Sequence, residues 1–114
     1  MNHLPYFNVG RTKRVEYASW NLNSLNLTDF ALSLSHISRY MGHTSRPYSV
    51  LEHLVLCENI LLDRASLFDP RAISRLALAV LVHDMHEALV TDMPSTHKRQ
   101  ISDWVPFEKR AEDA

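Results

Sequence analysis

Hydrophobic residues recur at near-helical spacing along most of the chain, starting close to residue 28. The apolar positions of the first run are Phe30, Leu32, Leu34, Ile37 and Tyr40. Thr28 or Asp29 can cap the start of a helix here, because short polar side chains satisfy free amide groups at a helix N-terminus. Gly42 is placed to stop it. We therefore expect a first helix from about residue 28 to about Arg39.

A connector over 43–48, which contains Pro47, separates this helix from a second one that Ser49 can cap. One apolar stripe of the second helix consists of Val50, Leu54, Cys57 and Leu61, and a wider apolar face adds Leu51, Val55, Ile60 and Leu62. A stripe of this width indicates a helix packed into the core.

Asp69 followed by Pro70 is typical of a helix start, with the aspartate as N-cap and proline at the first helical position. The apolar run that follows ends at His83-Asp84, and we expect the helix to continue with polar residues to about Val90. The polar segment 91–98 then contains Pro94, and a shorter helix is expected from Ser102 or Asp103 to the end.

The first 27 residues contain scattered turn-forming residues and no alternation typical of strands. We predict an irregular arm over 1–27, packed on one all-α domain over 28–114 that forms a helical bundle. A length of 114 residues supports one hydrophobic core, and 46% hydrophobic with 22% charged residues is ordinary for a globular protein.

A formal net charge of −1 supplies no positive field for nucleic acid or an anionic membrane, which argues against both as partners. The single cysteine, Cys57, has no partner for an internal disulfide and is interpreted as a buried thiol, which fits a reducing cytoplasm. The longest apolar run, 76–82, is far shorter than a membrane helix, so we expect neither a membrane span nor a secretion signal.

The most informative segment is AVLVHDMHEALV, where His83, Asp84, His86 and Glu87 follow an apolar run. Buried polar groups are normally paired, hydrogen-bonded or bound to a metal, and imidazole with carboxylate suits zinc, manganese, cobalt or iron better than calcium. If the loop after the second helix turns the third one back antiparallel, His53 can meet His83 and supply a further ligand. Glu87, one turn beyond His83, could hold and deprotonate a metal-bound water.

The order of the motifs SVLEH, HDMHE and TDMPSTHK, preceded by RYMGHTSRPYSVLEH, resembles the HD-domain metal-dependent phosphohydrolases. The likeness runs from about residue 28 to the end. It is greatest to the bacterial and phage 5'-deoxynucleotidases and deoxynucleotide triphosphohydrolases. H-E-x-x-H zinc proteases have their residues in a different order.

The resemblance implies an all-α HD-domain bundle that binds a divalent metal (Mn, Co, Zn, Fe or Mg) and a small nucleotide. The implied metal ligands are His53, His83 and Asp84. The implied catalytic residues are the carboxylates Glu87 and Asp92, and the implied substrate-binding residues are Arg39, Tyr40 and Lys98. Relatives complete the metal shell with an aspartate on a later helix, and Asp113 follows HDMHE too soon to be that ligand. We therefore interpret the domain as C-terminally truncated.

Each of these residues also has an ordinary structural interpretation. His53 could be a hydrogen-bonded core histidine, Glu87 a surface carboxylate and Asp92 the cap of a turn. Arg39 and Tyr40 could be a helix-terminal cation and a core aromatic. Both tryptophans, Trp20 and Trp104, are expected to pack rather than to stack on bases. His86 stands where relatives carry a small residue, so it is expected either to face solvent or to offer an extra donor.

The expected function is hydrolysis of a phosphate bond in a small (deoxy)nucleotide, by attack of a metal-bound water on phosphorus. The alternatives are a nucleotide-binding or regulatory module with impaired catalysis, and a gene fragment that lacks the last metal ligand. An open bundle edge would favour homo-oligomers.

Overall fold

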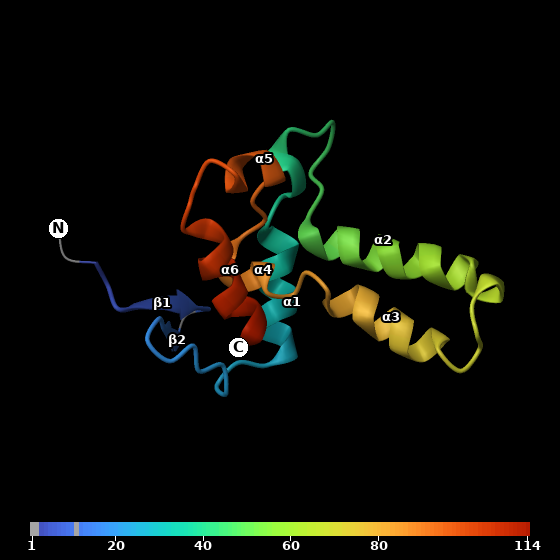
Figure 1. Ribbon diagram of the computed structural model, residues 1–114, viewed down its shortest axis with the longest axis horizontal. Coiled ribbons are helices and arrows are strands. Elements are labelled where there is room, and N and C mark those ends of the chain that lie inside the picture. Colours follow the sequence, from blue (N-terminus) through green and yellow to red (C-terminus); the bar gives the residue numbers. More distant parts are fainter. Residues whose placement is uncertain (1–2, 11) are drawn as a thin grey trace.

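The computed structural model describes residues 3–10 and 12–114, and it is mostly helical, as predicted (Figure 1). Positions 1, 2 and 11 of the predicted arm lie outside the described residues. The elements are β1 (Tyr6–Val9), β2 (Lys13–Glu16), α1 (Leu27–His36), η1 (Arg39–Gly42), α2 (Val50–Asp63), η2 (Ala65–Leu67), α3 (Ile73–Val82), α4 (Glu87–Val90), α5 (Ser95–Lys98) and α6 (Trp104–Asp113), where η denotes 3₁₀ helix. In the described ranges, no helix has the length and apolar character that crossing a bilayer requires.

The arm is more regular than predicted, because β1 and β2 pair as an antiparallel hairpin. The register runs from Tyr6 opposite Glu16 to Val9 opposite Lys13, and Gly10 begins the turn with φ +63°. The expectation of an arm without strands was therefore wrong. Each strand has only four residues, too few to show a clear alternation.

The first helix begins at Leu27, with Asn26 rather than Thr28 or Asp29 as its N-cap, so the cap lies two or three residues earlier than expected. The Asn26 side chain accepts the Asp29 amide at 3.0 Å, and the Asp29 carboxylate accepts the Asn26 amide at 2.9 Å. This reciprocal pair is a capping box built from asparagine and aspartate.

The same helix ends at His36, three residues before the predicted end at Arg39. The backbone leaves the helix because it pairs with the connector: the Arg39 amide donates to the Tyr48 carbonyl and the Val50 amide to the Ile37 carbonyl, each at 2.8 Å. Contacts between residues nine and thirteen positions apart override the helical preference here.

Helices α2 and α3 form an antiparallel hairpin, as expected, and it projects from the rest of the molecule (Figure 1). Ser49 caps α2 by accepting the Glu52 amide at 3.1 Å, which confirms the predicted start. Asp69 instead caps a turn, accepting the Arg71 amide at 2.9 Å, and α3 begins only at Ile73.

Two small hydrophobic cores hold the body together. The first joins the β-hairpin to α4 and α6 around Val15, Trp20, Val90 and Ala111. The second joins α1 to the base of α2 around Leu34, Val50 and Leu54. Trp20 is 9% exposed, in agreement with its predicted role in packing.

Candidate metal centre

Two histidines and one aspartate converge where the base of α2 meets the end of α3. One possible ligand atom from each of His53, His83 and Asp84 lies within 4.8 Å of the other two. Asp84 Oδ2 is 3.6 Å from His53 Nε2 and 3.1 Å from His83 Nε2. The hairpin thus brings together the three residues that the sequence predicts as metal ligands.

The position of His53 follows from the helix start at Ser49. Its amide donates to the Ser49 carbonyl at 3.1 Å, so His53 lies in the first turn of α2, at the base of the hairpin. Burial and then the nearby Arg39 guanidinium lower the pKa of His53, although Asp84 acts in the opposite direction. A lowered pKa favours the neutral imidazole, which is the form that binds metals.

The backbone changes at the motif itself, because α3 ends at Val82 and a turn over 83–86 separates it from α4. The prediction of one helix continuing to about Val90 was wrong. The amides of Met85, Glu87 and Ala88 donate three residues back, to Val82, Asp84 and Met85, which is the tighter 3₁₀ pattern.

The His83 ring is oriented by its own helix. Its Nδ1 contacts the Val80 carbonyl, which can only accept, so Nδ1 is the donor in this contact. Nε2 is left to face the Asp84 carboxylate, 3.1 Å from Oδ2. In metal sites, the ring nitrogen of a histidine that does not bind the ion commonly donates to a backbone carbonyl in the same way.

Glu87 is the most strongly perturbed acid in this region. It is 5% exposed, and its Oε2 has no hydrogen-bond partner within the described part of the chain. Burial, followed by the charges of Asp84 and Asp92, raises its pKa from 4.5 to about 8, although Arg39 and Lys98 act to lower it. Glu87 is therefore protonated at neutral pH unless further positive charge enters the site.

Arg39 and Asp92 form a half-buried ion pair, with Nη1 3.1 Å from Oδ2. Burial lowers the pKa of Arg39, but Asp92, Tyr40 and Glu87 together raise it above the usual value. The guanidinium carbon also lies 5.1 Å from the centre of the Tyr40 ring. Tyr40 is 60% exposed, so it is not the core aromatic of the alternative interpretation.

Lys98 is also already paired: its Nζ donates to both oxygens of Glu108 at 3.0 and 2.9 Å. His86 Nε2 lies 3.5 Å from the same carboxylate and is mostly buried, so His86 faces α6 rather than solvent or the three-residue cluster. Glu108 was not among the predicted site residues, because no pattern in α6 indicates which face meets α4 and α5.

One cleft of about 380 Å³ is lined by six of the eight predicted site residues: Arg39, Tyr40, Asp84, Glu87, Asp92 and Lys98. Asp84 also belongs to the cluster with His53 and His83, so it connects the cluster to the cleft.

Cys57, expected to be buried, is only half-buried, with its Sγ 3.8 Å from the His53 ring nitrogens.

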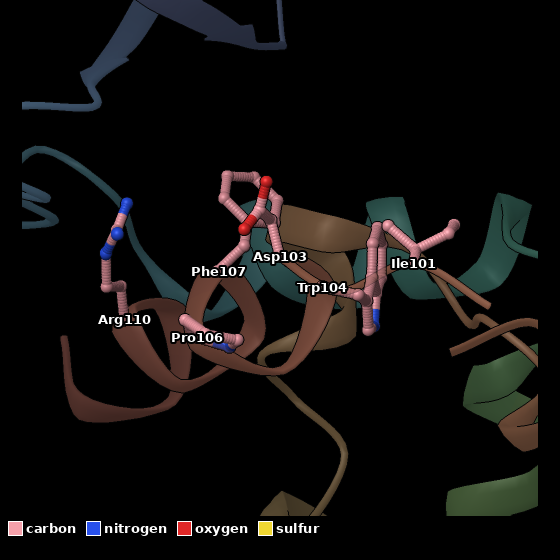
Figure 2. A pocket seen from close by; sticks show the side chains of 6 residues that line it. All are labelled: Ile101, Asp103, Trp104, Pro106, Phe107 and Arg110. Carbon is pink, nitrogen blue, oxygen red and sulfur yellow. The ribbon is translucent and has the colours of Figure 1, made fainter. Parts of the chain in front are cut away.

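A separate hollow lies on α6 and the loop before it (Figure 2). It is lined by Ile101, Asp103, Trp104, Pro106, Phe107 and Arg110, and none of these is a predicted site residue. Trp104 and Phe107 pack against the first core, which agrees with the predicted packing role of Trp104. Asp113, near the C-terminus, is paired with Lys109 at 2.9 Å and does not belong to the cluster of His53, His83 and Asp84.

Comparison with known proteins gives one similarity that covers most of the chain. No protein-family model matches the sequence. The chain is 33% identical over 98 residues to the Escherichia coli (strain K12) protein YfdR, which is described as uncharacterized. The match covers 86% of this chain and 49% of YfdR, so the chain spans about half the length of this relative.

Proposed function

We propose that this chain carries the metal site of an HD-type phosphohydrolase and hydrolyses a phosphate bond in a small deoxynucleotide. The observation that carries the proposal is the convergence of two imidazoles and a carboxylate beside a cleft that contains a buried glutamate. The donor set fits a divalent transition metal, for which mixed nitrogen and oxygen ligands are typical. His53, His83 and Asp84 would hold this ion.

A dication bound there would supply Lewis acidity, which lowers the pKa of water toward neutrality. Glu87 would serve as the general base. Its Oε2 is buried and has no hydrogen-bond partner in the ranges that the structure covers, so it is available to orient a water and take its proton. Positive charge held by the three ligands would favour the ionised carboxylate of Glu87, which is the form that accepts a proton.

The rest of the cleft supplies binding groups for a nucleotide. Arg39 offers a planar guanidinium that can contact phosphate oxygens in a bidentate manner, and Asp92 holds it in place. The exposed Tyr40 ring can contact the nucleoside, and Lys98, which also lines the cleft, can add a second cationic contact.

The test is hydrolysis of a panel of deoxynucleoside mono- and triphosphates by the purified chain with manganese or cobalt. We expect release of phosphate or triphosphate from at least one substrate, and its loss in the Glu87→Gln and His83→Ala variants. His36→Ala is the matched control, because His36 is exposed at the end of α1 and does not line the cleft. Absence of product from every substrate with either metal would contradict the proposal.

A second candidate is a nucleotide-binding module without turnover. It is favoured by the pairing of both cleft cations with carboxylates, Arg39 with Asp92 and Lys98 with Glu108, which reduces the charge available to a transition state. Calorimetric titration with the same nucleotides separates the two functions. Saturable binding with no hydrolysis would support the module.

A further inference from the structure

Lys98 is held by a carboxylate from another helix. Its Nζ donates to both oxygens of Glu108, at 3.0 and 2.9 Å. The two side chains are only 26% and 16% exposed, so water competes little for this contact. A lysine ammonium has three donors at the end of a flexible four-carbon chain. The contact with Glu108 uses two of them and leaves one for a ligand in the cleft that Lys98 lines.

The position of Glu108 follows from the packing of α6. Helix α6 packs on α4 through the first core, which contains Val90 of α4 and Ala111 of α6 (Figure 1). Glu108 precedes Ala111 by three residues, so the two lie on the same face of α6. His86, just before α4, has its Nε2 3.5 Å from the Glu108 carboxylate. Glu108 therefore has partners from two other segments, which offset the cost of burying its charge.

We propose that Glu108 is a positioning residue, which holds the Lys98 ammonium where it meets a phosphate group of the substrate. The inference deepens the proposed function and rests on it, because it requires that the cleft binds phosphate. Glu108 does not line the cleft itself, so it acts through Lys98. The held ammonium is close enough to the buried Glu87 to lower the pKa of that acid, which supports a place for Lys98 beside the reacting groups.

A positioning role and a simple counter-charge predict opposite results for Glu108→Gln. This substitution removes one negative charge and keeps the size of the side chain. If Glu108 only offset the charge of Lys98, its removal would strengthen phosphate binding. If Glu108 positions Lys98, the freed side chain must lose its rotational freedom when phosphate binds, and the dissociation constant should rise about fivefold.

Titration of inorganic phosphate into the metal-free chain, followed by NMR at the Asp92 amide in the same cleft, measures this constant. We expect Glu108→Gln to raise it about fivefold in the wild-type background and to leave it unchanged in the Lys98→Met background, because Glu108 acts through Lys98. Asp113→Asn is the matched control. It also removes a carboxylate from α6, but one that pairs with Lys109, so the constant should not change.

The mobility of the ammonium gives a second readout, which needs neither a ligand nor the Lys98→Met variant. The chain has three lysines, Lys13, Lys98 and Lys109, so their ammonium signals can be assigned one by one. NMR relaxation should show a more rigid ammonium at Lys98 than at the exposed Lys109, and Glu108→Gln should make the Lys98 ammonium mobile.

Four results would overturn the proposal. They are a wild type that binds no phosphate in the cleft, unchanged or stronger binding in Glu108→Gln, an equal effect of this substitution in the Lys98→Met background, and a mobile Lys98 ammonium in the wild type. A chain that shows the expected changes in phosphate binding but hydrolyses no nucleotide would support the positioning of Lys98 and contradict only the proposed hydrolysis.

Discussion

Replacing Glu87 by glutamine should remove a specific pH dependence from the stability of the metal-free protein. Glutamine keeps the size of the side chain and resembles the protonated acid, but it cannot ionise. The folded chain holds a proton on Glu87 up to a pKa of about 8, whereas the unfolded chain releases it near 4.5. Because the folded-state pKa is the higher one, this stabilisation is fully present below pH 4.5 and is lost as the pH rises through about 8.

The size of the effect follows from the two pKa values. Between them, each pH unit lowers the free energy of unfolding by about 1.4 kcal/mol, so the loss is on the order of 5 kcal/mol across the window. Glu87 is 5% exposed, so solvent screening reduces this value little. A loss of this size is a large fraction of the ordinary stability of a small domain, about 5 to 15 kcal/mol.

The assay is urea unfolding in the presence of a chelator at several pH values between 5 and about 8.5, for the wild type and Glu87→Gln. The difference between the two proteins isolates Glu87, because all other groups titrate in both. Glu112→Gln is the control, since Glu112 is exposed on α6 and should leave the pH dependence unchanged. Parallel curves for the wild type and Glu87→Gln would refute the argument that burial of this acid raises its pKa.

Two further predictions concern the elements around the site. Arg39→Ala leaves the mostly buried Asp92 without its guanidinium and should lower stability by about 1 to 3 kcal/mol, and the additional loss from Asp92→Ala in that background should be much smaller, as thermal unfolding would show. Additive losses would mean that the ion pair is not the source of the effect. Ser49→Ala removes the cap of α2 and should lower stability by about 1 kcal/mol. An unchanged melting temperature would exclude a stabilising cap.

The local signals in the sequence predicted the hairpin and the convergence of the cluster. Ser49 caps α2 through a contact three residues away, and the turn near Asp69 reverses the chain, so both depend on neighbouring residues. Once α2 and α3 are antiparallel, His53 and His83 must lie at the same end of the hairpin. Local chemistry was therefore sufficient for this part of the candidate site.

The features that the sequence did not predict depend on distant contacts. The early end of α1 follows from pairing with the connector before α2, and the partner of Arg39 is 53 residues away, in the segment after α4. Strands β1 and β2 gain their stability by covering Val90 and Ala111, far along the chain. Helical periodicity contains no information about such partners.

The most direct test of the account is the metal content of the chain. Equilibrium dialysis against manganese or cobalt, followed by elemental analysis, should give about one ion per chain for the wild type, and the His83→Ala variant should lose it, because the proposed site has only two imidazoles and one carboxylate to hold the ion. His86→Ala should retain the ion, because His86 contacts Glu108 rather than the cluster. A wild-type chain that takes up no ion, or a His83→Ala variant that binds as much as the wild type, would contradict the central claim.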